Sequence, residues 1–243
     1  MKKIVLILLL VASTVSSAWA QKELVFATDA TWPPMEFVDA EKNIVGYSIE
    51  YVKAVGEAAG FKPVFKNMAW DGIFAGLATG KYDAICSSVS ITDDRKKTMD
   101  FSTPYFKVRQ ALIVSKKSPV TSLDGLKGKK VGGQIGTTGY FAIKAAAGVE
   151  AKSYDEVGLA MEDLNVGRID AVVCDDPVAA DYALNQYKDT LKIAAILETG
   201  AVEFYGIAVK KGKKETLDLI NKGIAAVIAS GKEKELQQKW VGQ

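Results

Sequence analysis

One segment of this chain occurs twice in slightly altered form, and this internal repeat limits the folds open to the sequence. Gly80–Cys86 (GKYDAIC) resembles Gly167–Cys174 (GRIDAVVC). Each copy has a glycine that stops a helix, followed by a short apolar run typical of a buried strand. Polar pairs follow both copies, Ser87-Ser88 in the first and Asp175-Asp176 in the second. The repeat predicts two similar α/β halves.

The flanking sequence alternates strand and helix patterns in the same way. Strands are predicted over residues 23–27, 63–66 and 82–86, with helices over 48–59 and 71–79 between them. This alternation favours mainly parallel sheets with helices on both faces. The final segment, residues 212–243, has an apolar stripe typical of a helix. We expect it to pack back on the first half, so that the chain passes twice between the halves.

Polar residues end four of the predicted strands in matching positions, at Thr28-Asp29, Ser87-Ser88, Gln134 and Asp175-Asp176. One such ending means little, because loops are generally hydrated. Ligands of open α/β sheets bind beyond the carboxyl ends of the strands. Two halves whose polar strand ends face each other would therefore form a binding cleft.

The first twenty residues have the pattern of an export signal. Lys2 and Lys3 precede an apolar run over residues 4–12, and Ala18-Trp19-Ala20 fits a cleavage site, with cleavage expected after Ala20. The run is shorter than the ~20 residues that a membrane span needs, although an uncleaved anchor is the alternative. No cysteine lies near the site, so no lipid anchor is expected. The sequence predicts a periplasmic protein.

Charge and composition exclude several classes of function. Lys2 and Lys3 account for two of the 31 basic residues, so the mature chain has as many basic as acidic residues, 29 of each. This balance argues against nucleic-acid binding. Histidine is absent, which removes the commonest metal ligand and the usual general base. We expect no metal and no cofactor. Cys86 and Cys174 permit one disulfide in an oxidising compartment, or two buried free thiols.

Six segments in order along the chain resemble the polar amino-acid-binding proteins of ABC importers, the bacterial extracellular solute-binding family 3. They are Thr28–Phe37, Ser88–Arg95, Asp100–Tyr105, Gly136–Gly139, Asp170–Asp175 and Tyr205–Ile207. The resemblance implies the α/β fold of type II periplasmic binding proteins, with two Rossmann-like lobes joined by a two-strand hinge. After a signal peptide over residues 1–20, lobe 1 would comprise 21–106 plus 205–243, and lobe 2 would comprise 107–204.

An amino acid that is dehydrated on binding needs a partner for each of its two charges. Arg95, one of three arginines, can grip a carboxylate with two parallel hydrogen bonds, or it can be an ordinary surface residue. The resemblance assigns it to the α-carboxylate of the ligand, together with Ser90. Thr138 begins a predicted helix whose N–H groups favour an anion, although Thr137 or Thr138 can also serve as the helix cap.

The opposite charge would be supplied by Asp175, with Ser88 as a second contact for the α-ammonium of the ligand. Asp176 is the rival candidate from the residues alone, since either aspartate can cap the helix that Pro177 begins. The resemblance selects Asp175 for the ligand and leaves Asp176 as the cap.

The resemblance also implies a pocket for the ligand side chain. Its expected residues are Asp29, Trp32, Trp70, Ser87, Gln134 and Cys174. Two tryptophans could stack on a flat or cationic group, although both can also be core residues. Ser48 stands where relatives that bind basic amino acids carry aspartate, but Gln134 matches some arginine binders. Arginine is therefore favoured, with glutamine next. Surface positions are expected for Glu36 and Glu203.

The predicted function is that of a substrate-binding component, likened to a Venus flytrap, that closes on a free amino acid and delivers it to the membrane permease of an ABC importer. A monomer is expected. Two alternatives stay open: a periplasmic enzyme on the same scaffold, similar to the dehydratases of this superfamily, and the ligand-binding domain of a sensor. An enzyme needs a positioned acid or base, whereas the carboxylates of this site already have ligand charges to pair.

Overall fold

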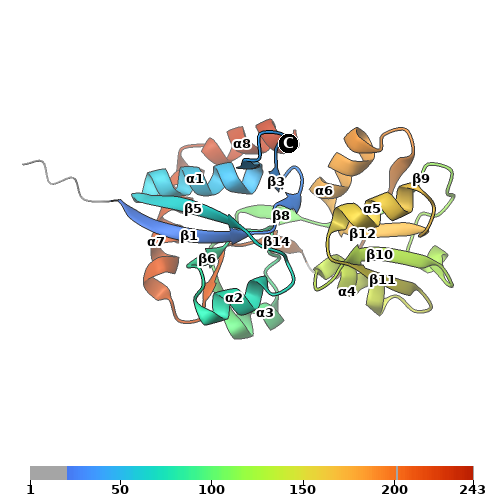
Figure 1. Ribbon diagram of the computed structural model, residues 1–243, viewed down its shortest axis with the longest axis horizontal. Helices are drawn as coiled ribbons and strands as arrows, with labels where there is room; N and C mark the ends of the chain where they lie inside the picture. The colour runs from blue at the N-terminus through green and yellow to red at the C-terminus, as the bar shows by residue number, and fades with distance from the viewer. Residues whose placement is uncertain (1–20, 201, 243) are drawn as a thin grey trace, which may run out of the picture.

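The computed structural model describes residues 21–200 and 202–242, which form two α/β lobes side by side (Figure 1). The predicted signal peptide, residues 1–20, lies outside the described residues. Each lobe is built on a five-stranded sheet, with strand order β5-β1-β6-β15-β7 in the first lobe and β11-β10-β12-β9-β13 in the second. The predicted fold class, two Rossmann-like lobes of the type II periplasmic binding protein fold, is confirmed.

The strands of the first lobe's sheet run in one direction except for β15. Strand β1 pairs in parallel with β5 and β6, while β15 runs antiparallel to β6 and β7. The strands are β1 (Lys22–Thr28), β5 (Phe61–Asn67), β6 (Ala84–Ile85), β7 (Met99–Phe101) and β15 (Ala208–Lys210). A small second sheet lies beside them, formed by β2 (Thr31–Trp32), β3 (Glu36–Val38) and β4 (Ile44–Val45).

Alternating side chains of β1 bury both faces of this sheet, as the period of a strand dictates. Phe26 packs toward α1 (Tyr47–Ala59) and α7 (Lys214–Ala229), whereas Ala27 packs toward α2 (Ile73–Thr79). Helix α7 approaches α1 very closely, because a Cβ at Gly223 would collide with the carbonyl oxygen of Val55. The C-terminal segment thus returns to the first lobe, as expected.

The second lobe repeats this plan. Its strands are β9 (Gln110–Ser115), β10 (Lys130–Gln134), β11 (Glu150–Tyr154), β12 (Ala171–Asp175) and β13 (Leu191–Ile196). Strand β10 is parallel to β11 and β12, while β9 is antiparallel to β12 and β13. The helical segments are a 3-10 turn (Asp124–Leu126), α4 (Thr138–Ala145), α5 (Val157–Asn165), α6 (Asp176–Asp181) and a π-helical turn (Tyr182–Gln186).

Two short antiparallel strands, β8 (Phe106–Val108) and β14 (Glu203–Tyr205), join the lobes. Both run through the middle of the molecule in Figure 1. Tyr205 pairs with Phe106 in this ladder, and their rings stack with centroids 5.7 Å apart. This buried aromatic contact ties the two crossings into one element.

Several predicted boundaries shift by a few residues. The C-terminal segment is two helices, α7 and α8 (Lys232–Val241), because Gly231 adopts a left-handed backbone conformation between them. Helix α1 begins at Tyr47 after Gly46, one residue before the predicted start. Lobe 1 also contains α3 (Asp93–Thr98). Over residues 21–200 and 202–242, no helix combines the length and the apolar character that crossing a membrane requires.

Candidate functional site

A small cavity lies between the lobes, where strands of both sheets end. Eight of the eleven predicted site residues line it, together with Thr137. The nine lining residues are Trp32, Trp70, Ser87, Ser88, Ser90, Arg95, Thr137, Thr138 and Asp175. The cavity has a volume of about 10 Å³, roughly the space that one water molecule needs. An amino acid therefore cannot enter this closed arrangement without movement of the surrounding groups.

The fold explains why these residues meet. Ser87 and Ser88 follow β6, Asp175 ends β12, and Thr138 begins α4 just after β10. These positions are the carboxyl ends of strands, where open α/β sheets bind ligands. Ser88 has a positive φ of 47°, a conformation that few residues other than glycine adopt. The turn after β6 therefore holds its polar groups in an unusual orientation.

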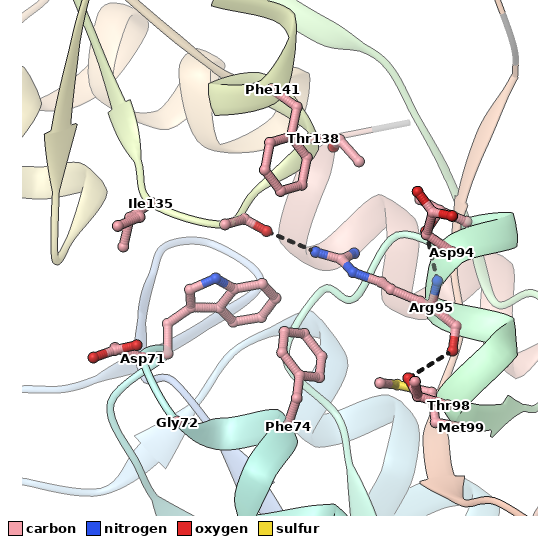
Figure 2. A pocket seen from close by; sticks show the side chains of 13 residues that line it. Asp71, Gly72, Phe74, Asp94, Arg95, Thr98, Met99, Ile135, Thr138 and Phe141 are labelled. Carbon is pink, nitrogen blue, oxygen red and sulfur yellow. Dashed lines mark hydrogen bonds between the residues drawn. The ribbon is translucent and has the colours of Figure 1, made fainter. Parts of the chain in front are cut away.

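Arg95 brings a buried cation to the cavity from α3. Its guanidinium donates to the carbonyl oxygens of Ser90 at 2.7 Å and of Gly136 at 3.0 Å. The second bond crosses from lobe 1 to lobe 2 and is drawn in Figure 2. The guanidinium carbon lies 5.5 Å from the ring centroid of Trp70 and 5.2 Å from that of Phe74, within cation–π range.

Burial lowers the pKa of Arg95 to about 10, and the negative charges of Asp175 and Glu203 oppose that shift. The guanidinium thus stays charged at neutral pH. A larger hollow of about 530 Å³ opens beside the cavity and shares Trp70, Arg95 and Thr138 with it. In Figure 2, Phe74 and Phe141 lie on opposite sides of the Arg95 guanidinium in this hollow.

The start of α4 faces the same place from the second lobe. The hydroxyl of Thr137 accepts from the N–H of Tyr140 at 3.1 Å, so Thr137 is the helix cap. Thr138, the first residue of the helix, lies with its hydroxyl oxygen 3.5 Å from that of Ser90. This geometry leaves Thr138 available for an anion, since its neighbour satisfies the capping requirement.

Asp175 is the buried anion of the cavity. One carboxylate oxygen accepts from the Tyr205 hydroxyl at 2.5 Å, and the other accepts from the Gln110 amide at 2.6 Å. Burial raises the pKa of Asp175 to about 7, although both hydrogen bonds lower it. An ammonium group placed beside this carboxylate would favour its charged form. The hydroxyl of Ser88, in contrast, has no hydrogen-bond partner among residues 21–200 and 202–242.

Three further polar groups form a network across the lobes beside the cavity. The Gln134 amide nitrogen donates to the Asp29 carboxylate at 2.8 Å and to the Asp155 carbonyl oxygen at 2.7 Å. The Trp32 indole N–H donates to the Gln134 amide oxygen at 2.5 Å. Burial raises the pKa of Asp29, while bonds from Gln134 and Thr31 lower it. Asp29 and Gln134 do not line the cavity, but Gln134 links Asp29 to Trp32, which does.

Cys174 does not line the cavity. Its side chain is buried, and its thiol lies 3.7 Å from the carbonyl oxygen of Asp175. Cys86 and Cys174 are both free thiols. Among the described residues, no cluster of three or more cysteine, aspartate or glutamate side chains could hold a metal ion.

The structure corrects two expectations near the cavity and places Ser48. Asp176 is not a helix cap, because Asp175 occupies that position and the Asp176 carboxylate pairs instead with Arg109, at 3.0 Å from its guanidinium. Ser48 lies in the first turn of α1, and its hydroxyl is 3.2 Å from that of Tyr105. Glu36 was expected at the surface but is fully buried, because β3 turns this side chain toward the first lobe.

Sequence reasoning also missed two residues that hold Asp175, namely Gln110 and Tyr205. Both are fully buried. Tyr205 belonged to a segment of the family resemblance, but only its place in the hinge ladder brings it to Asp175. The pairing of Gln110 with Asp175 follows from the register of β9 on β12, which no sequence pattern revealed.

Two lobes that enclose a buried cation and a buried anion are the architecture of a solute-binding protein. The family described as "Bacterial extracellular solute-binding proteins, family 3" matches residues 24–243. The chain belongs to this family, as its motifs predicted, and the interpretation as an enzyme is set aside because the family and the relatives that follow are binding proteins.

Three relatives illustrate the likeness. The chain is 34% identical to "ABC transporter arginine-binding protein 1" of Escherichia coli (strain K12), over 100% of both chains. It is 35% identical to "Probable histidine-binding protein" of Neisseria gonorrhoeae, over 88% of this chain and 81% of that one. A solved structure, "An ancestral arginine-binding protein bound to glutamine", is 40% identical with a TM-score of 0.86, and the match covers 92% of this chain and 100% of that one.

Proposed function

We propose that this protein binds one free polar amino acid between its lobes and delivers it to the permease of an ABC importer. The observation that carries the proposal is the placement of Arg95 and Asp175 in one buried cavity, on opposite lobes. Every free amino acid presents a carboxylate and an ammonium, and both need a partner once water is removed. The relatives named as amino-acid-binding proteins support this function.

In the proposed complex, Arg95, Ser90 and Thr138 hold the α-carboxylate. Asp175 and Ser88 hold the α-ammonium, for which the unpaired Ser88 hydroxyl is a ready acceptor. Trp32, Trp70, Ser87, Asp29 and Gln134 surround the ligand side chain. Cys174 contributes packing behind Asp175 but no ligand contact.

Arginine is the favoured ligand and glutamine the next. The network beside the cavity offers three acceptors, namely the Asp29 carboxylate, the Gln134 amide oxygen and the Asp155 carbonyl oxygen. A guanidinium has five N–H donors and no acceptor, so it can satisfy all three if the Gln134 amide moves aside. Burial of Asp29 without a full charge partner also favours a cationic side chain. The glutamine amide supplies two donors and would leave Asp29 without a counter-charge.

Ligand entry requires the lobes to separate, because the closed cavity holds about 10 Å³. The lobes that move would be those implied by the family, with residues 21–106 plus 205–243 as lobe 1 and residues 107–204 as lobe 2. The hinge between them would be β8 and β14. The ligand contacts both lobes only when they close, so binding shifts the equilibrium toward closure. We further propose export to the periplasm, cleavage after Ala20 and a monomeric mature protein.

The test is a thermal-shift screen of the mature protein against the twenty amino acids, followed by calorimetric titration of each that stabilises it. A ligand at a thousand times its Kd adds about 4 kcal/mol to the free energy of unfolding. We expect arginine to give the largest shift and glutamine the second. No stabilisation by any amino acid would refute the function, and recovery of the ligand chemically changed after incubation would restore the enzyme hypothesis.

A further inference from the structure

The amide of Gln110 lies between the two ends of the proposed ligand clamp. Its nitrogen is 2.6 Å from a carboxylate oxygen of Asp175 and 3.1 Å from the hydroxyl oxygen of Thr138. Asp175 is the proposed partner of the ligand ammonium, and Thr138 of its carboxylate. Gln110 itself does not line the cavity. One neutral side chain therefore supports both groups from behind.

The surroundings fix the orientation of this amide. A third oxygen, from the Glu203 carboxylate, lies 3.3 Å from the same nitrogen. Turning the amide over would place its oxygen against three other oxygens, so the nitrogen must face them. The Gln110 amide oxygen has no hydrogen-bond partner among the described residues. A buried oxygen without a hydrogen bond destabilises a fold, so the orientation of the Gln110 amide lowers the stability of the folded protein.

Space on the other side of the amide is equally restricted. Gly139 in α4 lies so close to Gln110 that a Cβ at position 139 would collide with the Gln110 amide oxygen. Gln110 opens β9 directly opposite Asp175 in the antiparallel ladder. It follows the hinge strand β8 by two residues. The side chain is thus held by the sheet, by α4 and by the hinge.

Tyr205 completes the support of Asp175 from the other hinge strand. Its hydroxyl donates to the second carboxylate oxygen at 2.5 Å, and its ring packs against Tyr105 and Phe106. We propose that Gln110 and Tyr205 are positioning residues that aim the Asp175 carboxylate, and through Gln110 the Thr138 hydroxyl, at the backbone of the bound amino acid. This inference rests on the proposed function.

The test compares calorimetric titrations of Gln110→Met and Tyr205→Phe with wild type, using arginine and glutamine from pH 5.5 to 9. Tyr205→Phe loses the bond to Asp175, and Gln110→Met loses the bonds to Asp175, Thr138 and Glu203. The Kd for every ligand should therefore rise about tenfold to a hundredfold at pH 7 with the ligand ranking unchanged. Both lost bonds to Asp175 lower its pKa. The midpoint of affinity against pH should therefore move to higher pH, which a loss of packing would not cause.

Matched controls exist in the second lobe. Gln186 and Tyr154 also donate to aspartates, Asp181 at 2.7 Å and Asp163 at 2.9 Å. Gln186→Met and Tyr154→Phe should leave affinity and its pH profile as in wild type. If Gln110→Met fails to fold, as judged by circular dichroism, Tyr205→Phe decides the proposal alone.

A second measurement separates this inference from the proposed function. In an Asp175→Asn background, Gln110→Met should cause a much smaller further loss of affinity, since contacts in one network are not additive. Equal losses in both backgrounds, or wild-type affinity in both single variants, would overturn the positioning role. If wild type itself binds no amino acid, the proposed function fails, and the inference fails with it.

Discussion

The indole nitrogen of Trp32 and the amide oxygen of Gln134 lie 2.5 Å apart and join lobe 1 to lobe 2. Gln134 also donates to Asp29, so a single glutamine of the second lobe contacts two residues of the first. The bond from Arg95 to the carbonyl oxygen of Gly136 also joins the lobes, beside the larger hollow that adjoins the cavity. Closure is thus held by polar bonds on both sides of the cavity.

Trp32→Phe removes the indole donor and keeps a ring in place. We expect the variant, without added ligand, to populate more open arrangements and to have a larger radius of gyration than wild type in small-angle scattering. The control is Trp240→Phe, since the Trp240 indole donates to Glu50 within the first lobe. Equal radii for Trp32→Phe and wild type would show that this bond does not hold the lobes closed.

Arg95→Ala should abolish amino-acid binding while the fold remains intact. Removing one partner of a buried charge pair is destabilising by about 3–5 kcal/mol, so affinity should fall by at least about a hundredfold. Titration calorimetry measures the loss, and circular dichroism checks the fold. Arg168→Ala is the control, because that exposed arginine pairs with Asp163 away from the cavity. Near-normal affinity of Arg95→Ala would contradict the carboxylate assignment.

Asp29→Asn should change which ligand binds best. The variant removes the negative charge proposed to face the ligand side chain, so the affinity for arginine should fall by about tenfold or more while that for glutamine changes by less than about threefold. Competition titrations with both amino acids measure the ratio. Asp189→Asn, at an exposed position, should change neither affinity. An equal loss for both ligands would place Asp29 in the backbone clamp instead.

Glu36→Gln should stabilise the protein at neutral and alkaline pH. Burial raises the pKa of Glu36 well above its ordinary value, although the nearby Ser48 and Ser88 hydroxyls lower it. No hydrogen bond of normal geometry reaches either carboxyl oxygen among the described residues. A folded-state pKa above the unfolded value means that stability is lost as pH rises from about 4.5 through the folded pKa. Glutamine removes this loss, so Tm should rise by about 2–4 °C at pH 8.

The difference between Glu36→Gln and wild type should nearly vanish below pH 4, where the carboxyl is protonated in both folded and unfolded protein. Thermal melts from pH 3.5 to 8 measure this dependence. Glu57→Gln, at an exposed position of α1, serves as the control. A constant difference at all pH values would mean that the effect arises from packing and not from ionisation.

The sequence repeat and the strand-end residues predicted the fold class and most of the cavity lining. Strand periodicity can be read from neighbouring residues, and the rule that ligands bind at the carboxyl ends of strands requires only the direction of the sheet. The supports of Asp175 were not predictable in that way. Gln110 and Tyr205 reach it from 65 and 30 residues away along the chain, through strand register and hinge pairing. Glu36 was misplaced because a three-residue strand is too short to show which side faces inward.

The bonds of Gln134 to Trp32 and Asp29 join the two lobes where the ligand side chain is proposed to bind. Trp32, Gln134 and Asp29 satisfy one another in the closed arrangement, so an arriving amino acid must replace bonds that already exist. The apparent affinity is then the intrinsic affinity multiplied by the fraction of molecules that are open. Only a ligand whose bonds to the site are stronger than these bonds between the lobes would then bind well, so the inter-lobe bonds contribute to specificity.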